Sequence, residues 1–542
     1  MFKRINIVKG IEPEQQFLLP IDVRDWLPED DIVYMIQSVL GLLDFSSFLS
    51  KYRSDGVGSA FYDPRCMLGI IIYAMIRGEQ SSRKIEVACR YDIGYRIVAQ
   101  GLTPDHSTLF RFKQANAQEI KGIFKQLAQY LVEARITRVG VLALDGTKIG
   151  ANASLSANRK AKYIESELNH IFAESLKVDE QETGDGTTSD ETQYNLPGNL
   201  DTLEKRKKAL LEAQAKLKER QEIEAEKQKD RILEREREEE ETGKKKRGRK
   251  LSDPQTSPSP DAKVNTTDPT SQIMSTTQGF IQGFNAQAIV TEDQFILATS
   301  VTDDQNDKNQ LQPMIQELNA LFSTVRTPER PHAVVADAGY YSAENMMSET
   351  LNGVQLFLAT SKERKFLDID SDEGFFIRLD EVCRRSFNDI SPTIPELAAI
   401  ATGVWHFFLD RDTPATRPEV CKTIMDTRVR SSTGRGIYRK RKVTVEPVFG
   451  NIKHNMRFKR FSLKGKENCE GEFSAAAIGH NIVKIKSTNT LGKLRAFLSK
   501  IIPPSHIGDV IRQTCDSFGH LATSLIQLFP FGFMRSYPIS ST

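Results

Sequence analysis

Three acidic residues stand where the chain can present carboxylates to a divalent cation: Asp145, Asp337 and Glu446. Asp145 ends the apolar run "VLALD", and Asp337 directly follows the apolar run "AVVA". A strand that leaves a buried core can present a polar side chain at its carboxyl end, where ligands gather in α/β sheets. Carboxylate oxygens suit Mg²⁺, and two such ions about 4 Å apart activate a water or hydroxyl in phosphodiester chemistry. The pattern therefore indicates metal-dependent chemistry on a phosphodiester.

Each aspartate also has a purely structural interpretation. Asp145 and Gly146 form a common turn dipeptide, and taken alone this dipeptide favours a turn. Asp337 has the right chemistry to cap a helix, although it stands several residues before the helix start that we expect near Ser342 or Ala343. The two interpretations of Asp337 are equally favoured by the sequence.

Glu446 lies in "VTVEPVFGNIKHNMRF", residues 443–458, which we predict to be a helix with Pro447 in its first turn. One face of this helix is apolar, and a second face carries an acid, a glycine and two cations: Glu446, Gly450, Lys453 and Arg457. A glycine in a helix costs about 1 kcal/mol relative to alanine, so it needs a reason. A nucleic-acid backbone that approaches the glycine while Lys453 and Arg457 hold phosphates supplies one. The alternative is a charge pattern on a solvated face.

The remaining elements predict a mixed α/β fold with a helical region before it. Residues 1–137 contain short amphipathic helices, one of them starting at Pro64 after a cap at Asp63. Their cationic residues, among them Arg111 and Lys113, suit a helix-turn-helix layout that contacts DNA, and a plain helical bundle is equally favoured. From Arg138 onward, apolar strands alternate with helices, which predicts a sheet with parallel and antiparallel pairs.

A charged block interrupts this pattern after the first of those strands. Its long helix has leucines seven residues apart at Leu203, Leu210 and Leu217, but Glu224 breaks the series. A solvated helix or a short hairpin is therefore favoured over a continuous coiled coil. The predicted organisation has five parts: a helical domain (1–137), the first part of the core (138–177), the charged insertion (178–272), the second part of the core (273–487) and a helical tail (488–542).

Composition excludes several classes of protein. The 542 residues carry a formal net charge of only +2, but basic residues are concentrated between Arg435 and Lys466, which suggests contact with a polyanion. The six cysteines form no C-x-x-C pair, so neither a disulfide framework nor a zinc ribbon is indicated. The longest apolar run, Met67–Ile76, is too short to span a bilayer. We therefore expect a reduced, soluble, cytoplasmic protein without a membrane partner.

Together these residues resemble the DDE transposases of bacterial insertion sequences, and within them the insertion-sequence "eleven eighty-two" group. The resemblance runs in order over about residues 10–490. It is carried by "DGTKIGANAS", "RGRK", "NTTDPTS", "GFNAQAIV", "NDKNQLQPM", "ADAGYYS" and "YRKRKVTVEPVFGNIK". The third motif of many such enzymes is Y-(2)-R-(3)-E-(6)-K, and Lys453 stands at the correct distance from Glu446. Lys442 occupies the arginine position and Arg439 the tyrosine position, while Tyr438 is one place out of register.

This resemblance implies a ribonuclease H-like catalytic core in which Asp145, Asp337 and Glu446 bind two Mg²⁺ or Mn²⁺ ions. The enzyme would cut the transposon ends, and the freed 3′-hydroxyls would attack target DNA. Lys453 would position the terminal phosphates. The other cations that we assign to DNA binding are Arg457, Lys442, Arg439, Arg111 and Lys113. The N-terminal helices would recognise the terminal inverted repeats on double-stranded DNA, and pairing of two ends implies a homodimer, associated with the nucleoid when bound to DNA.

Three alternatives stay open at this point. A ribonuclease H-fold nuclease that cuts without strand transfer would carry the same three acids. A non-catalytic DNA-binding regulator derived from a transposase would tolerate the loss of those acids, which here all stand in intact sequence context. A coiled-coil scaffold built on residues 203–233 is disfavoured by the broken heptad.

Overall fold

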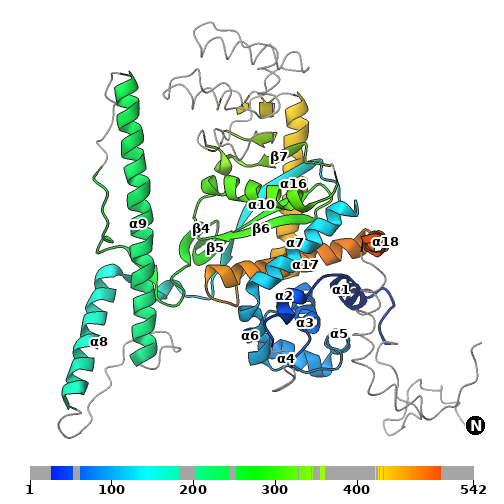
Figure 1. Cartoon of the computed structure of the whole chain (residues 1–542), viewed down its shortest axis with the longest axis horizontal. Helices are drawn as coiled ribbons and strands as arrows, with labels where there is room; N and C mark the ends of the chain where they lie inside the picture. Colours follow the sequence, from blue (N-terminus) through cyan, green and yellow to red (C-terminus); the bar gives the residue numbers. More distant parts are fainter. Residues whose placement is uncertain are drawn as a thin grey trace, which may run out of the picture.

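The computed structural model describes residues 26–52, 61–181, 203–242, 252–327, 329–342, 345, 355–360, 422, 425–426, 428–430 and 432–501. The basic run that includes "RGRK", the segment 361–421 and the tail after residue 501 lie outside the described residues. The described chain forms a cluster of N-terminal helices, a mixed sheet with helices on both faces, and a long two-helix arm to one side (Figure 1).

The N-terminal region is helical, as predicted. Its helices are α1 (Ile32–Gly41), α2 (Ser46–Leu49), α3 (Pro64–Ile76), α4 (Ser82–Tyr91), α5 (Ile93–Val98), α6 (His106–Ala115) and α7 (Ala117–Glu133). Local sequence sets several of their starts, because an acidic cap accepts the first free backbone amides. Asp63 accepts from the amide of Arg65 before α3, and Asp105 accepts from the amides of Ser107 and Thr108 before α6. The predicted cap at Asp63 is confirmed.

The sheet contains β1 (Val141–Gly150), β4 (Gln272–Thr276), β5 (Gly279–Thr291), β6 (Ile296–Thr302), β7 (Ala333–Ala336) and β8 (Leu356–Leu358). The strand order is β4-β5-β1-β7-β8, and β6 also pairs with β5. β1 is antiparallel to β5 and parallel to β7, while β6 is antiparallel to β5. β1, β6 and β7 therefore run in the same direction, and their carboxyl ends lie at the same edge of the sheet.

β1 is longer than the sequence predicts. Asp145 and Gly146 lie inside the strand, where they pair with Ala288 and Gln287 of β5, so the turn interpretation of this dipeptide is wrong. Gly146 has a packing reason to be glycine. A Cβ there would lie 2.3 Å from Nε2 of Gln287 and 2.7 Å from Oδ1 of Asp307, which is closer than atoms can approach.

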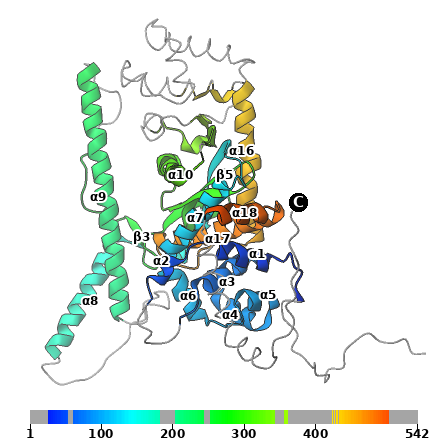
Figure 2. The ribbon, with the colours of Figure 1, turned by 45° about the vertical axis from the view of Figure 1, so that its right-hand side comes forward.

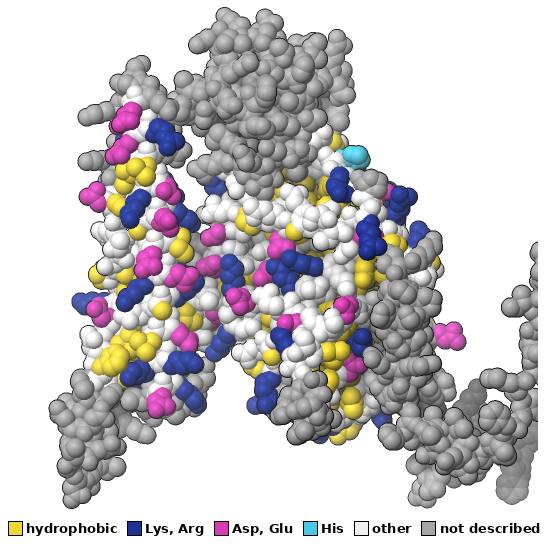
Figure 3. Space-filling view, in the orientation of Figure 1, with side chains coloured by type: hydrophobic (Ala, Val, Ile, Leu, Met, Phe, Trp, Pro, Cys, Tyr) yellow, Lys and Arg dark blue, Asp and Glu magenta, His cyan; other side chains and the backbone are white. Residues whose placement is uncertain are grey.

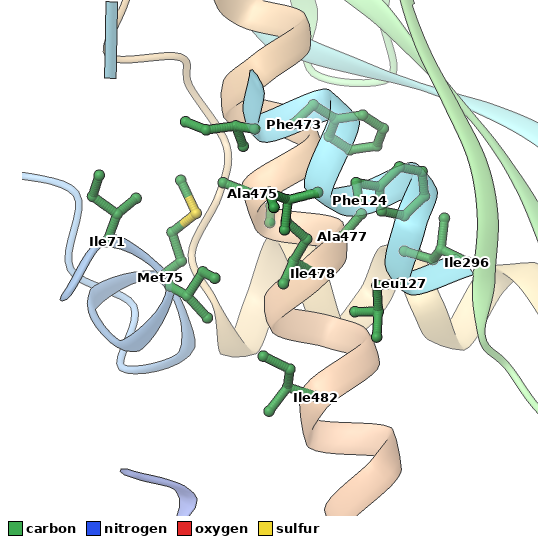
Figure 4. Close-up of a cluster of buried hydrophobic side chains, with 14 of the residues drawn as sticks. Ile71, Met75, Phe124, Leu127, Ile296, Phe473, Ala475, Ala477, Ile478 and Ile482 are labelled. Carbon is green, nitrogen blue, oxygen red and sulfur yellow. The ribbon is translucent and has the colours of Figure 1, made fainter. Parts of the chain in front are cut away.

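Helices cover both faces of the sheet because residues along each strand alternate between the two faces. Leu142 and Leu144 pack with α10 (Leu311–Thr324) in one apolar cluster. Val141 and Ala143 pack in a second cluster with α16 (Ser432–Gly450) and α17 (Lys466–Ser487). This second cluster is continuous with the N-terminal helices, since Ile71 of α3 lies on the same core as α17 (Figure 4). The helical region and the sheet thus share one core.

The arm consists of α8 (Ala161–Gln181) and α9 (Leu203–Thr242), both inserted between β1 and β5. A two-stranded ladder of β2 (Asn158–Lys160) and β3 (Lys263–Asn265) closes its base. The two helices share a small apolar cluster that includes Ile164 and Leu217. They stand apart from the sheet in two views, and acidic and basic side chains alternate over the visible surface of α9 (Figures 1, 2 and 3). The charged segment is thus one long solvated helix packed on α8.

The helix that carries Glu446 differs from its predicted form. α16 begins at Ser432, so Pro447 lies in its interior and not in its first turn. A proline has no amide hydrogen, so the carbonyl four residues earlier loses its helical partner. That carbonyl belongs to Val443, and Nε2 of Gln294 donates to it at 3.0 Å. A short π-helical turn, Asn451–Asn455, follows α16 and carries Lys453.

The described chain ends with α18 (Leu491–Ile501), in the region predicted to be helical. None of the helices among the described residues combines the length and the apolar character needed to cross a membrane.

Candidate active site

The structure brings Asp145, in the middle of β1, close to Asp337, which directly follows the neighbouring parallel strand β7. Ala143 of β1 is the register partner of Val335 of β7, and continuing this register by two residues sets Asp145 beside Asp337. Residues paired in this way lie roughly 5 Å apart. Both side chains belong to the face that carries Ala143 and Val335, which is the face covered by α16. Two carboxylates from distant parts of the chain therefore share one edge of the sheet.

The Asp145 carboxyl is mostly buried, and this burial raises its pKa to about 6. The guanidinium of Arg441 opposes the shift, since Nη1 lies 3.2 Å from Oδ2 of Asp145, while the nearby carboxylates of Asp337 and Asp307 add to it. Oδ1 of Asp145 accepts from the amide of Gly146 at 2.8 Å. Like charges held close together are unfavourable, so this edge of the sheet is suited to a cation.

Asp337 has the capping role considered from sequence, at a different turn from the one expected. Its Oδ1 accepts from the amide of Gly339 at 2.8 Å and so caps a short 3₁₀ turn, Ala338–Tyr340. The capped turn begins directly after the aspartate and not near residue 342. Capping uses one carboxylate oxygen, which leaves the second one for other partners.

Tyr438 and Arg441 of α16 face the two aspartates. Arg441 bonds to Asp145, and burial raises the pKa of the Tyr438 hydroxyl, with Asp337 and Asp145 both close enough to contribute. Arg439 and Lys442, which sequence reasoning placed in the tyrosine and arginine positions, are exposed. The residues that face the site are thus shifted by one position from the predicted register.

Glu446 lies on the exposed side of α16. It follows Arg441 by five residues, which corresponds to about 7.5 Å along a helix axis and about 140° around it. Val445, which lies between these two residues in the sequence, is fully buried. Within the described residues, no group of three or more His, Cys, Asp or Glu side chains lies close enough to hold a metal ion. The structure therefore brings two of the three acids together and leaves Glu446 on a neighbouring surface.

Asp307 is an acid near this pair that sequence reasoning did not assign. It follows the carboxyl end of β6 by five residues and contributes to the charge around Asp145. Its Oδ1 accepts from Nδ2 of Asn285 at 2.7 Å and from Nε2 of Gln287 at 2.8 Å. The signal was present in the sequence, because acidic residues follow the apolar run of β6 as they follow those of β1 and β7.

Lys453 stands in the π-helical turn close to other cations. Burial lowers the pKa of its ammonium group, and the charges of Lys148 and Lys459 lower it further. Three cations this close to one another favour an anion between them. Lys148 belongs to the end of β1, three residues beyond Asp145, so this basic cluster adjoins the paired aspartates.

Among the other residues predicted to contact DNA, Arg457 and Arg111 are exposed, whereas Lys113 is buried. Arg457 is exposed, and the carbonyl of its backbone accepts from Gln80 at 3.0 Å. Arg111 is exposed and lines a hollow of about 440 Å³ between α4 and α6. Lys113, in contrast, is only 6% exposed, and its Nζ donates to Ser462 at 2.6 Å and lies 3.7 Å from Glu472. Lys113 is therefore an interior ion-pair residue in this structure, and its burial does not suit the predicted contact with DNA.

The site combines paired acids at a sheet edge with an adjoining group of cations, as a protein that handles a metal ion and a phosphate requires. Two family models match the chain: a transposase domain, DUF772, over residues 21–115 and a transposase DDE domain over residues 413–486. Both matches are to transposase domains, and they support a DDE transposase of a bacterial insertion sequence. No curated protein and no solved structure matches it.

The two matches cover different parts of the described structure. The first spans α1 to α6, and the second contains α16, the π-helical turn and nearly all of α17. Glu446 and Lys453 fall inside the matched DDE segment, whereas Asp145 and Asp337 lie outside both matches.

Proposed function

We propose that this protein cleaves the ends of its own insertion sequence and joins the freed 3′-hydroxyls to target DNA. The single observation that carries the proposal is that Asp145 of β1 and Asp337, directly after the parallel strand β7, lie close together beside α16, which falls within the matched DDE segment. This arrangement agrees with a ribonuclease H-like core and with the "eleven eighty-two" group, to which we assign the chain.

The residues at this edge fit a divalent cation. Asp145 is buried next to other carboxylates, and Arg441 and the Gly146 amide oppose the resulting charge only in part, so a bound cation would relieve both burial and repulsion. Mg²⁺ needs only one or two protein carboxylates and keeps several waters. Asp145 and Asp337 would hold it, with Glu446 as the third acid. When bound, two such ions supply an activated nucleophile and stabilise the leaving oxygen.

The chain's own residues would bind and orient the DNA. Lys453 would hold the terminal phosphate together with Lys148, which lies near it at the end of β1. Arg439 and Lys442 are exposed on the same side of α16 as Glu446, and they would contact the DNA backbone there. A phosphate bound by these cations would place the scissile bond on the side of α16 that carries Glu446. The bound DNA would in this way complete the active site.

The N-terminal helices would recognise the terminal inverted repeats. Arg111 and the exposed residues around the hollow between α4 and α6 would make these contacts. Two ends must be held at once, so we propose a homodimer in the synaptic complex. The five-part division of the chain, with the insertion at residues 178–272, also remains our proposal; α8, most of which that division assigns to the core, packs on α9.

The test uses DNA from the element's own ends with Mg²⁺ and compares the wild type with Asp337→Asn and the control Asp253→Asn. Asp253 is an exposed residue in the segment that follows α9. We expect cleavage by the wild type and the control, and none by Asp337→Asn. Strand transfer with pre-cut ends then separates a transposase from a nuclease. Cleavage by Asp337→Asn at the wild-type rate would refute the proposal.

One observation favours a second candidate, a non-catalytic DNA-binding regulator. Glu446 does not join the two aspartates in a metal-binding group among the described residues. A regulator would bind the element's ends and would show no metal-dependent cleavage in the same experiment.

A further inference from the structure

Asp307 reaches the acidic edge of the sheet from a third strand. β6 runs in the same direction as β1 and β7, and the loop after its last residue, Thr302, leads to Asp307 at that edge. Asp307 is close enough to Asp145 to raise the pKa of its carboxyl. Nothing in the DDE pattern used above includes this residue, so its place beside the two aspartates needs an explanation of its own.

The two oxygens of the Asp307 carboxylate have different surroundings. Oδ1 accepts from Nδ2 of Asn285 at 2.7 Å and from Nε2 of Gln287 at 2.8 Å, and Nζ of Lys148 lies 3.9 Å away. Tyr340 in turn donates to Oε1 of Gln287, which fixes the orientation of that amide. In the described part of the chain no donor bonds to Oδ2. The carboxylate is thus held by one oxygen and presents the other.

The free oxygen of Asp307 and the Asp337 carboxylate both lie beside Gly339. A Cβ added at Gly339 would lie 3.0 Å from Oδ1 of Asp337 and 3.6 Å from Oδ2 of Asp307. The two carboxylates therefore border the same glycine, which has no side chain to separate them. Two carboxylates so placed repel each other unless one is protonated or a cation lies between them.

A buried amide oxygen gives independent support for a ligand. Asn285 is completely buried, and its Oδ1 has no hydrogen-bond partner, although its Nδ2 is bonded to Asp307. A Cβ added at Gly146 would lie 3.0 Å from this oxygen and 2.7 Å from Oδ1 of Asp307, so both atoms border the same small space. A buried acceptor is normally satisfied. Amide oxygens bind hard cations or their water ligands.

We propose that Asp307 and Asp337 together bind a divalent cation, with Asn285 oriented toward its water ligands. The inference rests on the proposed function, because it names a ligand of the same metal centre. Hydrogen bonds that fix a ligating carboxylate are a regular feature of metal sites, and Asn285 and Gln287 supply them. Two carboxylates with several waters suit Mg²⁺, so this site needs no group of three acids in the described residues.

The test measures Mn²⁺ binding to the full chain by the loss of the free-ion electron paramagnetic resonance signal, with and without the element's end DNA. We expect Asp307→Asn to weaken Mn²⁺ binding at least tenfold, and Asp253→Asn to leave it unchanged. Asparagine keeps an oxygen that accepts from Asn285 and Gln287, so the fold should survive. A circular dichroism spectrum and melting temperature equal to those of the wild type would establish this.

A second variant separates a ligand from a structural residue. Asp307→Cys replaces a hard oxygen by a soft sulfur, so we expect the preference for Cd²⁺ over Mn²⁺ to rise at least tenfold relative to the wild type. A residue that only supported the fold would leave this preference unchanged, and that result would overturn the proposal.

The failure of this proposal is distinguishable from the failure of the proposed function. If Asp307→Asn binds Mn²⁺ as the wild type does while Asp337→Asn loses it, Asp307 is not a ligand and the proposed function stands. If Asp337→Asn also binds as the wild type does, or the wild type binds no Mn²⁺ in the presence of its end DNA, both proposals are overturned.

Discussion

Protonation of His480 should destabilise the junction between α16 and α17. His480 is 2% exposed; its Nε2 donates to the carbonyl of Gln294 at 2.8 Å, and its Nδ1 accepts from Asn451 at 2.9 Å. The neutral ring is therefore fully satisfied. Burial lowers the pKa of this imidazole to about 4, the hydrogen bond to the Gln294 carbonyl opposes the shift, and the nearby charge of Lys484 adds to it.

The sign and size of the effect follow from linkage. Because the folded pKa is below the unfolded value, the unfolded chain binds more protons between the two values, and stability falls as the pH falls. The contribution is complete above about pH 6.5 and decreases through the folded pKa. With a folded pKa of about 4, the loss is about 2 kcal/mol at pH 5 and about 3 kcal/mol at pH 4.

Hydrogen exchange on peptides from α17 measures this loss, after correction for the intrinsic pH dependence of exchange. His480→Gln keeps a donor for the Gln294 carbonyl and removes the titration, so its α17 protection should change little between pH 7 and pH 4.5. The matched control is His454→Gln, because His454 is exposed in the π-helical turn; it should behave as the wild type. Equal pH dependence in wild type and His480→Gln would refute the reasoning.

Three further outcomes follow from the same contacts. Arg441→Ala removes the cation beside the buried Asp145 carboxylate; we expect end cleavage to fall at least tenfold, with Arg441→Lys intermediate, and equal cleavage by all three would contradict the role given to Arg441. Gly471→Ala forces a Cβ to 2.5 Å from the backbone of α7, so a urea titration should show that the free energy of unfolding falls by about 1–3 kcal/mol. The control Gly492→Ala, whose added Cβ has nothing within 4 Å, should lower the free energy of unfolding by less. Gln294→Ala leaves a carbonyl of α16 without its partner, so peptides from α16 should exchange faster than in the wild type, and unchanged exchange would rule out this support.

Sequence reasoning predicted most helices and the main strands because their apolar residues repeat with a clear period. It also predicted that Asp145 and Asp337 would lie at strand ends. Asp337 directly follows β7, whereas Asp145 lies in the middle of β1, because β1 continues to Gly150 by pairing with β5. The short strands β3 and β4 were not predicted, since their residues are largely polar. They form strands because they pair with β2 and β5, respectively.

The register of α16 and the place of Asp307 depended on contacts that are distant in sequence. Tyr438 and Arg441 face the site because α16 starts early and continues through Pro447. Pro447 leaves the Val443 carbonyl without a helical partner, and Gln294, more than 140 residues away in the chain, donates to that carbonyl. Asp307 is oriented by the amides of a neighbouring strand. Neither of these contacts can be predicted from the local sequence pattern. The sequence therefore identified candidate site residues, but it could not show which of them face the site.

The ladder of β2 and β3 at the base of the arm has a consequence for how this chain can vary. Asn158 and Asn265 are paired there although more than one hundred residues separate them. The two ends of the arm thus lie side by side at this ladder, and Arg220 of α9 adds a contact to Asp303 after β6. The entropic penalty of a loop rises slowly with its length. Segments can therefore be gained or lost beyond this ladder over generations, or replaced by a tag in the laboratory, while the catalytic strands keep their alignment.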